Sequence, residues 1–552
     1  MAELFDQALV LHGHGRLDEA AGLYARQLAA EPGHHGARHM LGVIRAQQGR
    51  FAEAAELIAL AANANPDDAL AWANLGNVLN ALGRPDRALE ALDRAVALNP
   101  QAADAWNNRG IALQRLGQAD MALQSYEQAL AVQPVFVPAL NNRGLARLAR
   151  RRFTEALADF DRAMAHEPDN LASNLGRGGA LQRLTRHDEA LAAFNRALGL
   201  APDHAPGWAN RGLALMSLGQ VHDARESLER AVALAPDLAD AHVSLGLIHL
   251  LTGNWKAGWP LLEWRKRTAD PLEARYYPQP LWTGAEDLTG KTLYAYIEQG
   301  LGDAIQFHRF AALAQARGAA VVLGVHAPLI RLLESATPAV ALINNTETPA
   351  QFDYHIPLAS IPLAVKLLPE AIPATARYLA AEPQRVADWK ARLGDRGFRI
   401  AIAWQGNESI PGAEGKSFPL AALAGVARLP GVRLISLQKN DGAEQLEQLP
   451  DGMAVEQYDI DSGRDAFLDS AAIMENCDLV IACDTAPAHL AGALGVPAWI
   501  ALKHVPDWRW GLEGDKSPWY PSLRLFRQAA PGDWDSVFSS LERALASRLN
   551  RS

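Results

Sequence analysis

Small and apolar residues recur through the first half of the chain at a constant spacing of 34 residues. Small residues are needed where two helices touch, and a proline ends one helix before the next begins. The pattern therefore predicts about seven to eight stacked helical hairpins over residues 1–252. The four series are Pro32, Pro66, Pro100, Pro134, Pro168, Pro202 and Pro236; Gly42, Gly76, Gly110, Gly144, Gly178, Gly212 and Gly246; Ala20, Ala54, Ala88, Ala122, Ala156, Ala190 and Ala224; and Tyr24, Ile58, Leu92, Tyr126, Phe160, Phe194 and Leu228.

This spacing is the tetratricopeptide (TPR) pattern, a helix–turn–helix of 34 residues per unit. The first unit is weakly patterned and is typical of a cap, and the last one runs into a tryptophan-rich segment. TPR units stack into a superhelix whose concave face binds extended peptides. We therefore expect an all-α TPR superhelix that recruits a protein, with homo-oligomers through the TPRs as a further option.

A row of asparagines occupies one position of the repeat. An amide carries donors and an acceptor, so such a row can bind a peptide backbone without reading its side chains. It resembles the asparagine ladder of eukaryotic O-GlcNAc transferase. The alternative is that these amides bond within pairs of helices, and Gly176 and Ser244 interrupt the row, so both interpretations stay open. The row consists of Asn74, Asn108, Asn142 and Asn210.

A junction follows over residues 253–290, where tryptophans crowd together. Trp255, Trp259, Trp264 and Trp282 lie in this stretch. We favour an aromatic wedge that packs the TPR array onto the next domain, because large aromatic side chains bury much area. An acceptor-binding platform is the minority alternative.

Short apolar runs alternate with amphipathic helices in residues 291–385 and again in 386–552. Each block predicts a doubly wound parallel sheet of the Rossmann-like type. Polar residues follow the strands at Gln299–Asp303, Gln405–Asn407, Gln438–Lys439 and Asp484–His489. Because ligands bind beyond the carboxyl ends of such strands, near helix N-termini that favour anions, we expect a cleft there.

Composition narrows the class of protein. A formal charge of -10 argues against nucleic acid as a partner, since that calls for a concentrated basic face. There is no apolar run of membrane-spanning length, and the N-terminus lacks the pattern of a secretory signal. We expect a cytoplasmic protein without stable membrane insertion. Cys477 and Cys483 have neither disulfide-framework nor zinc-site spacing, which predicts small buried thiols.

Residues from about 253 to 552 resemble a GT-B glycosyltransferase of the heptosyltransferase-like type, fused to TPRs as in bacterial TPR-glycosyltransferases. The resemblance is carried by the order and spacing of several segments: "EQGLGDAIQFHRF", "FDYHIPLASIPL", "IAWQGN", "SLQK", "DLVIACDTAPAHLAGALGVPAW" and "PDWRWGLEGDKSPWYPSLRLFRQ". Some TPR-glycosyltransferases of this kind modify bacterial flagellins with nonulosonic acids. The resemblance implies two Rossmann-like domains, with the acceptor side in 291–385 and the nucleotide-sugar side in 386–552.

On the acceptor side, the resemblance implies that Asp303 is the general base of an inverting transfer. A carboxylate at a cleft edge can take the proton of an acceptor hydroxyl as the anomeric carbon is attacked. The alternatives are that Asp303 caps the following helix, or that His308 is the base, although packing suits His308 better. Gln299, Gly300, Gly302 and His308 are the other expected cleft residues.

On the donor side, the resemblance puts Asp484 near the sugar and Thr485 and His489 near the phosphates, at a helix N-terminus. Lys416 would neutralise the leaving phosphate, helped by Lys439. No metal is expected, because GT-B enzymes generally work without one, and the Asp-x-Asp triplet at Asp459–Asp461 is interpreted as a loop. The remaining expected donor-binding residues are Gln405, Asn407 and Gln438.

The leading hypothesis is thus a metal-independent, inverting protein O-glycosyltransferase without a cofactor. It would use a nucleotide sugar and a Ser or Thr hydroxyl of a protein held by the TPRs, with flagellin and a nonulosonic acid donor suggested by the resemblance. One alternative is a TPR interaction scaffold with a degenerate transferase domain. Another is a saccharide or lipid glycosyltransferase whose TPRs serve assembly.

Overall fold

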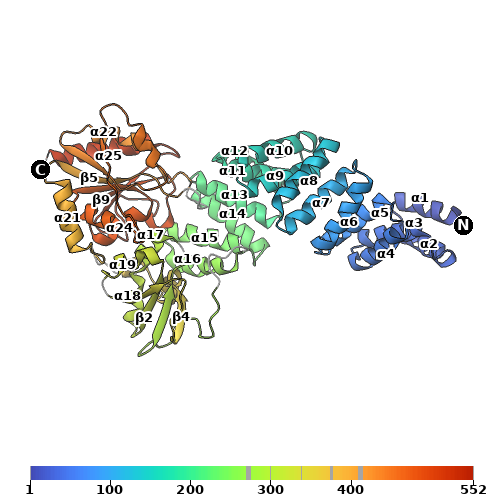
Figure 1. Ribbon diagram of the computed structural model, residues 1–552, viewed down its shortest axis with the longest axis horizontal. Helices are drawn as coiled ribbons and strands as arrows, with labels where there is room; N and C mark the ends of the chain where they lie inside the picture. Colours follow the sequence, from blue (N-terminus) through green and yellow to red (C-terminus); the bar gives the residue numbers. More distant parts are fainter. Residues whose placement is uncertain are drawn as a thin grey trace. The chain divides into compact units, whose positions relative to one another are not determined.

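The computed structural model describes residues 2–268, 275–298, 300–336, 339–372, 377–407 and 414–550. The chain divides into two compact units, Met1–Arg211 and Gly212–Ser552, which we describe separately (Figure 1).

The first unit is built from helical hairpins in which each repeat supplies two antiparallel helices. Helix α13, Ala205–Ser217, crosses the division between the two units. The twelve helices before it are α1 Ala2–Gly13, α2 Leu17–Ala30, α3 His35–Gln47, α4 Phe51–Ala64, α5 Ala69–Ala81, α6 Pro85–Leu98, α7 Ala103–Arg115, α8 Ala119–Val132, α9 Val137–Ala149, α10 Phe153–His166, α11 Leu171–Arg183 and α12 His187–Leu200.

The glycine series lies where the two helices of a hairpin touch. A Cβ atom added to Gly110 would lie 2.4 Å from Cε1 of Tyr126, and one added to Gly144 would lie 2.7 Å from Cζ of Phe160. Both rings are fully buried. The glycine and the large residue of each repeat are therefore two halves of one contact, which explains why both keep the 34-residue step.

A tryptophan near the start of several repeats forms a hydrogen bond between the first helix of its repeat and the preceding turn. The indole Nε1 of Trp72 donates to the carbonyl of Pro66 at 2.9 Å, and that of Trp106 donates to the carbonyl of Pro100 at 2.9 Å. Trp208 repeats the contact with the carbonyl of Pro202 at 2.8 Å. These bonds satisfy carbonyls just beyond the ends of the preceding helices, which would otherwise need water.

The second unit begins with the end of the helical array. Its helices are α14 Val221–Leu234, α15 Ala239–Leu251 and α16 Trp255–Leu262, followed by the 3-10 helix η1 Glu263–Arg267. A Cβ atom added to Gly258 would lie 3.0 Å from the carbonyl oxygen of Gly246, so α15 and α16 form one more hairpin.

Helix α16 carries two of the junction tryptophans into a buried cluster. Trp255 stacks on Trp519 with ring centroids 5.1 Å apart, and Trp259 meets Trp508 edge-on at 5.3 Å. All four side chains are buried. The aromatic wedge predicted from the sequence is confirmed for these two tryptophans, which pack the last hairpin onto the C-terminal α/β domain.

The first sheet has four parallel strands in the order β3-β2-β1-β4. The strands are β1 Thr292–Tyr296, β2 Ala320–Val325, β3 Ala341–Asn344 and β4 Tyr354–Pro357, and the associated helices are α17 Leu301–Phe307, α18 Phe310–Gln315, η2 Ala327–Leu329, α19 Ile330–Leu333, η3 Leu358–Ser360, α20 Ile361–Ala364 and η4 Pro369–Ala371. The strand order reverses direction at β1, so the crevice between the ends of β1 and β4 is the expected ligand position.

The second sheet has six parallel strands in the order β10-β9-β8-β5-β6-β7. This is the order of a doubly wound Rossmann sheet, with its switch point between β5 and β8. The fold class predicted from the sequence, a TPR array followed by two parallel α/β sheets, is confirmed. The strands are β5 Phe398–Ala403, β6 Val432–Ser436, β7 Val455–Glu456, β8 Leu479–Cys483, β9 Ala498–Leu502 and β10 Leu523–Arg527, and the helices are α21 Pro383–Leu393, η5 Leu420–Leu423, α22 Ala424–Ala427, η6 Ala443–Glu447, α23 Leu468–Glu475, α24 Ala486–Leu494, η7 Trp508–Trp510 and α25 Trp534–Leu549.

Among the helices that the structure describes, none combines the length and the apolar character needed to cross a membrane.

Candidate functional site

Two helix N-termini meet where the two sheets approach each other. Helix α17 follows β1 and helix α24 follows β8, and the two helices pack side by side (Figure 1). A Cβ atom on Gly302 would lie 3.1 Å from Cδ2 of His489 and 3.4 Å from Cα of Ala486. The absence of a side chain at Gly302 therefore lets α17 pack closely against the start of α24.

Asp303 lies in the first turn of α17 and has two partners. Its Oδ2 atom accepts a hydrogen bond from the backbone N–H of Gly300 at 3.2 Å, and its Oδ1 atom forms an ion pair with Arg509. The helix-capping interpretation of Asp303 is thus confirmed, and it leaves the catalytic interpretation open because a carboxylate has further acceptor capacity. Burial raises the pKa of Asp303, although Arg509 opposes the rise.

Arg509 joins the two α/β domains. Its guanidinium also pairs with Asp507 at 2.8 Å and donates to the side-chain oxygen of Gln306. It lies 4.7 Å from the centroid of the Trp508 ring, and its side chain is 9% exposed. A planar cation with fixed partners on several sides is held in one orientation, so Arg509 positions the Asp303 carboxylate.

Lys416 and Asp484 form the second ion pair of the cluster. Their charged atoms lie 2.9 Å apart, and Lys416 is also 3.8 Å from Asp507. The indole of Trp510 donates to Asp484 at 2.7 Å. Burial acts to lower the pKa of Lys416, but Asp484 and Asp507 outweigh it and raise that pKa, so the ammonium stays charged at neutral pH.

The N-terminus of α24 is not capped by a side chain. Thr485 occupies the N-cap position, but its hydroxyl donates back to the carbonyl of Cys483 at 3.4 Å. The methyl group of Thr485 lies against Gly406, where an added Cβ atom would be only 2.6 Å away. A helix N-terminus without a side-chain cap favours an anion through its N–H groups and its dipole.

His489 is a buried, neutral side chain. It is 6% exposed, its Nδ1 lies 3.1 Å from the hydroxyl of Tyr520, and its ring stacks on Trp510 at 5.4 Å. Burial, helped by the charge of Arg509, lowers the pKa of His489 to about 3. Any contact of His489 with a phosphate would therefore come from the neutral imidazole.

The four remaining predicted donor-binding residues lie in the segments that follow β5 and β6. The amide oxygen of Gln438 accepts from the backbone N–H of Gln405 at 3.1 Å, and its Nε2 donates to the carbonyl of Gln405 at 2.9 Å. The ammonium of Lys439 donates to the carbonyls of Ile460, at 3.2 Å, and Asp461. Asn407 is exposed at the end of a described segment. Donor contacts of these residues stay predictions.

The other predicted cleft residues have different surroundings. Gly300 is the N-cap of α17, whereas Gln299 lies outside the described residues. His308 is 2% exposed, and burial lowers its pKa to about 4. These surroundings are those of a packed side chain, so they favour the packing interpretation over His308 as the base.

Two of the four asparagines in the predicted row form side-chain hydrogen bonds to the preceding repeat. Nδ2 of Asn74 lies 3.0 Å from Nε2 of His39 on α3, and Nδ2 of Asn142 donates to Asn107 on α7 at 2.9 Å. Asn108 accepts from its neighbour Asn107 at 3.5 Å, and Asn210 is half-buried. The amides of Asn74 and Asn142 thus link the first helices of neighbouring repeats, and peptide binding by the row stays a prediction.

Four residues of the cluster were not predicted as site residues: Lys503, Asp507, Arg509 and Trp510. All four lie in the segment after β9, within or just before "PDWRW". The available signal was a group of charged residues interleaved with tryptophans directly after a buried strand, the position at which parallel sheets place ligands.

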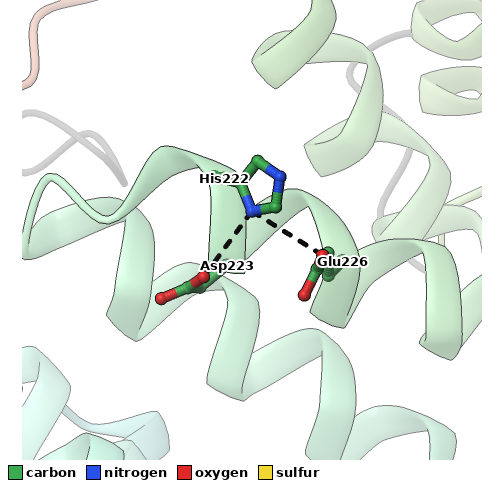
Figure 2. A group of neighbouring side chains, drawn as sticks. All are labelled: His222, Asp223 and Glu226. Carbon is green, nitrogen blue, oxygen red and sulfur yellow. Dashed lines mark ion pairs between the residues drawn. The ribbon is translucent and has the colours of Figure 1, made fainter.

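Two acidic groups elsewhere are not part of this site. Asp461 belongs to the Asp-x-Asp triplet, and its carboxylate accepts from the backbone N–H of Asp469 at 2.7 Å and from the hydroxyl of Ser470. It therefore caps the start of α23. On α14, His222, Asp223 and Glu226 lie close together with side chains between 56% and 70% exposed (Figure 2). Their solvated positions on one helix give no sign of a bound ion.

The sequence comparisons match two different families to two parts of the chain. Models of the tetratricopeptide repeat match residues 11–77, 76–117, 103–136, 141–205 and 178–249. The model "Glycosyltransferase family 9 (heptosyltransferase)" matches residues 410–502, which begin six residues before Lys416 and finish at the end of β9. These matches support a TPR protein with a glycosyltransferase-like domain.

Among curated proteins, Protein FlbA of Caulobacter vibrioides is 29% identical over 323 residues, covering 54% of this chain and 53% of FlbA. The chain thus spans about half the length of this relative. Among solved structures, the Cut9–Hcn1 hetero-tetramer of the APC/C is similar at 18% identity, with 44% and 48% of the two chains covered and a TM-score of 0.40. YrrB, a TPR protein with an unusual peptide-binding site, is 25% identical over 34% of this chain and 96% of its own, with a TM-score of 0.30.

Proposed function

We propose that the chain is a glycosyltransferase that moves a sugar from a nucleotide-sugar donor to a Ser or Thr hydroxyl of a protein recruited by its TPR helices. The observation that carries the proposal is the charged cluster between the two sheets. In this cluster Asp303, on the helix after β1, pairs with Arg509 of the second α/β domain, and the ion pair of Lys416 and Asp484 lies beside the uncapped N-terminus of α24.

The donor would lie at the end of β8. Its phosphate would bind the N–H groups of α24 and the ammonium of Lys416, which is held nearby by Asp484. When the bond between the anomeric carbon and the phosphate oxygen breaks, the electron pair leaves with the phosphate. The charge of Lys416 stabilises this leaving group without a metal ion.

The acceptor hydroxyl would approach from the side of Asp303. The carboxylate takes the hydroxyl proton while the oxygen attacks the anomeric carbon from the face opposite the phosphate, which inverts its configuration. Burial raises the pKa of Asp303 and so makes it a stronger base than an exposed aspartate. Arg509 limits this rise and keeps the carboxylate oriented.

The acceptor class rests on the TPR helices, since arrays of this kind bind extended peptide segments. The family resemblance suggests flagellin as the first acceptor to test and a nonulosonic acid as one donor sugar. An array devoted to protein recruitment also favours a protein acceptor over a lipid or a free saccharide.

The test uses the purified full chain and a panel of UDP-, GDP-, ADP- and CMP-linked sugars. A donor that binds should raise the thermal unfolding midpoint by mass action, and slow hydrolysis should release its nucleotide. Asp303→Asn should keep the midpoint shift and lose hydrolysis and transfer. A chain that neither binds nor hydrolyses any member of the panel would exclude the proposed function, and a fully active Asp303→Asn variant would exclude Asp303 as the base.

A further inference from the structure

Lys503 differs from the other cations of the cluster in its partner. Lys416 pairs with Asp484, and Arg509 pairs with Asp303 and Asp507. Within the described part of the chain, the hydrogen bond of the Lys503 ammonium goes to a neutral group, the backbone carbonyl of Glu414, at 3.1 Å. Lys503 therefore gains more than the other two from a bound anion.

The fold places Lys503 beside the proposed phosphate position. Strands β8 and β9 are parallel neighbours in which Cys483 is level with Ala501. Thr485 and Lys503 each lie two residues beyond this pair, just after the carboxyl ends of their strands, and α24 begins at the next residue after Thr485. Glu414, which holds the Lys503 ammonium, lies two residues before Lys416. Both lysines thus lie near Asp484, the residue before the N-cap of α24.

The electrostatics fit an anion bound near both lysines. Lys503 is partly buried, and burial followed by the charge of Lys416 lowers its pKa, although the more weakly acting carboxylates of Asp484, Glu414 and Asp507 oppose the fall. An ammonium in this position lacks full solvation and is repelled by a like charge. Two neighbouring anionic groups would reach both lysines and offset both effects, whereas one anionic group can be matched by Lys416 and the helix N-terminus alone.

We propose that Lys416 and Lys503 form a two-lysine site that holds two neighbouring anionic groups of the donor. This inference rests on the proposed function and specifies its substrate class. The second anionic group has two chemical sources. It is either the second phosphate of a nucleoside diphosphate sugar or the carboxylate of an acidic sugar linked to a nucleoside monophosphate.

The test compares nucleotide binding by the full-length wild type, Lys503→Met, Lys503→Arg and the control Lys390→Met, measured by isothermal titration calorimetry. Lys390 is an exposed residue of α21. The ligands are UDP, GDP, ADP, the matching monophosphates, and a CMP-linked acidic sugar beside CMP. Loss of one charge-assisted contact should weaken binding about tenfold.

With a diphosphate donor, Lys503→Met should weaken the nucleoside diphosphates about tenfold and the monophosphates less than about twofold. With an acidic sugar donor, the same selective loss should appear for the CMP-linked sugar relative to CMP. In either case Lys503→Arg should restore most of the affinity. An equal effect on both ligand classes, or no effect, would overturn the role of Lys503 and leave the proposed function standing. A wild type that binds no nucleotide would overturn both.

Discussion

Asp303 and Arg509 form an ion pair that connects the helix after the first strand of one sheet to the segment after the fifth strand of the other. The pair is shielded, with side-chain exposures of 21% for Asp303 and 9% for Arg509. Arg509 also pairs with Asp507, so its removal would leave two carboxylates without their main partner. The contact therefore affects both the stability of the domain pair and the basicity of Asp303.

Arg509→Met should move the acidic limb of the pH–rate profile to higher pH. A base acts in its deprotonated form, and Arg509 lowers the pKa of Asp303, so its loss raises that pKa and reduces the active fraction at acidic pH. At a fixed pH below the pKa of Asp303, the rate of donor hydrolysis by Arg509→Met should be about tenfold lower than that of wild type for each unit by which the pKa has risen. An unchanged profile would show that Asp303 does not set this limb.

The same variant should lower the free energy of unfolding by about 3 kcal/mol, because a shielded ion pair is broken from one side only. Arg524→Met is the matched control. Arg524 pairs with Asp515 at 3.2 Å, but both side chains are about half exposed or more, at 49% and 59%. Its loss should change stability by about 0.5 kcal/mol or less, as measured by urea unfolding.

His489 should make the second unit less stable in acid. The pKa of its imidazole is lowered from the ordinary value to about 3, so between these values the unfolded chain binds a proton that the folded chain does not. The contribution is complete above about pH 6.5 and is lost at about 1.4 kcal/mol per pH unit as the pH falls toward the folded pKa. His489→Asn should therefore flatten the dependence of unfolding free energy on pH between 6 and 4, relative to wild type.

The control for this experiment is His222→Asn, since that imidazole is 70% exposed. Its substitution should leave the slope of stability against pH as in wild type. The measurement is the urea midpoint of the second unit at several pH values. An equal slope for wild type and His489→Asn would contradict the prediction.

Periodicity predicted the helical half of the fold well because its contacts are local and repeated. Gly110 and Tyr126 belong to one hairpin, and the same contact recurs in neighbouring repeats, so the 34-residue step contains both partners. The two sheets were also predictable, because each strand is a short apolar run followed by polar residues at its carboxyl end.

Partners across the site were less predictable. Asp303 and Arg509 are 206 residues apart, and no local pattern links them. Gln438 and Lys439 were predicted to bind the donor because they follow a strand. Their polar groups form hydrogen bonds with nearby loops. Position at a strand end identifies candidates, but only the packing of α17 against α24 shows which of them meet.

Gly110→Ala should destabilise the first unit. The added methyl group would lie 2.4 Å from the buried ring of Tyr126, which has no room to move, so overpacking should cost about 1–3 kcal/mol. Gly199→Ala is the matched control on α12, because nothing lies within 4 Å of its added Cβ atom. There the better helix propensity of alanine should stabilise by about 0.5–1 kcal/mol. Thermal unfolding followed by circular dichroism should show opposite shifts, and shifts of the same sign would contradict the packing argument.

Two fragments that lack different lengths of the TPR array should differ in whether they fold. A fragment of residues 212–552 corresponds to the second compact unit and retains the hairpin of α15 and α16. A fragment of residues 253–552 loses α15, so the buried Leu250 and Leu251 no longer cover Trp255. We expect the longer fragment to unfold cooperatively and keep nucleotide binding, and the shorter one to be rapidly digested by trypsin. Equal resistance of the two fragments would show that the last hairpin is dispensable for the α/β domains.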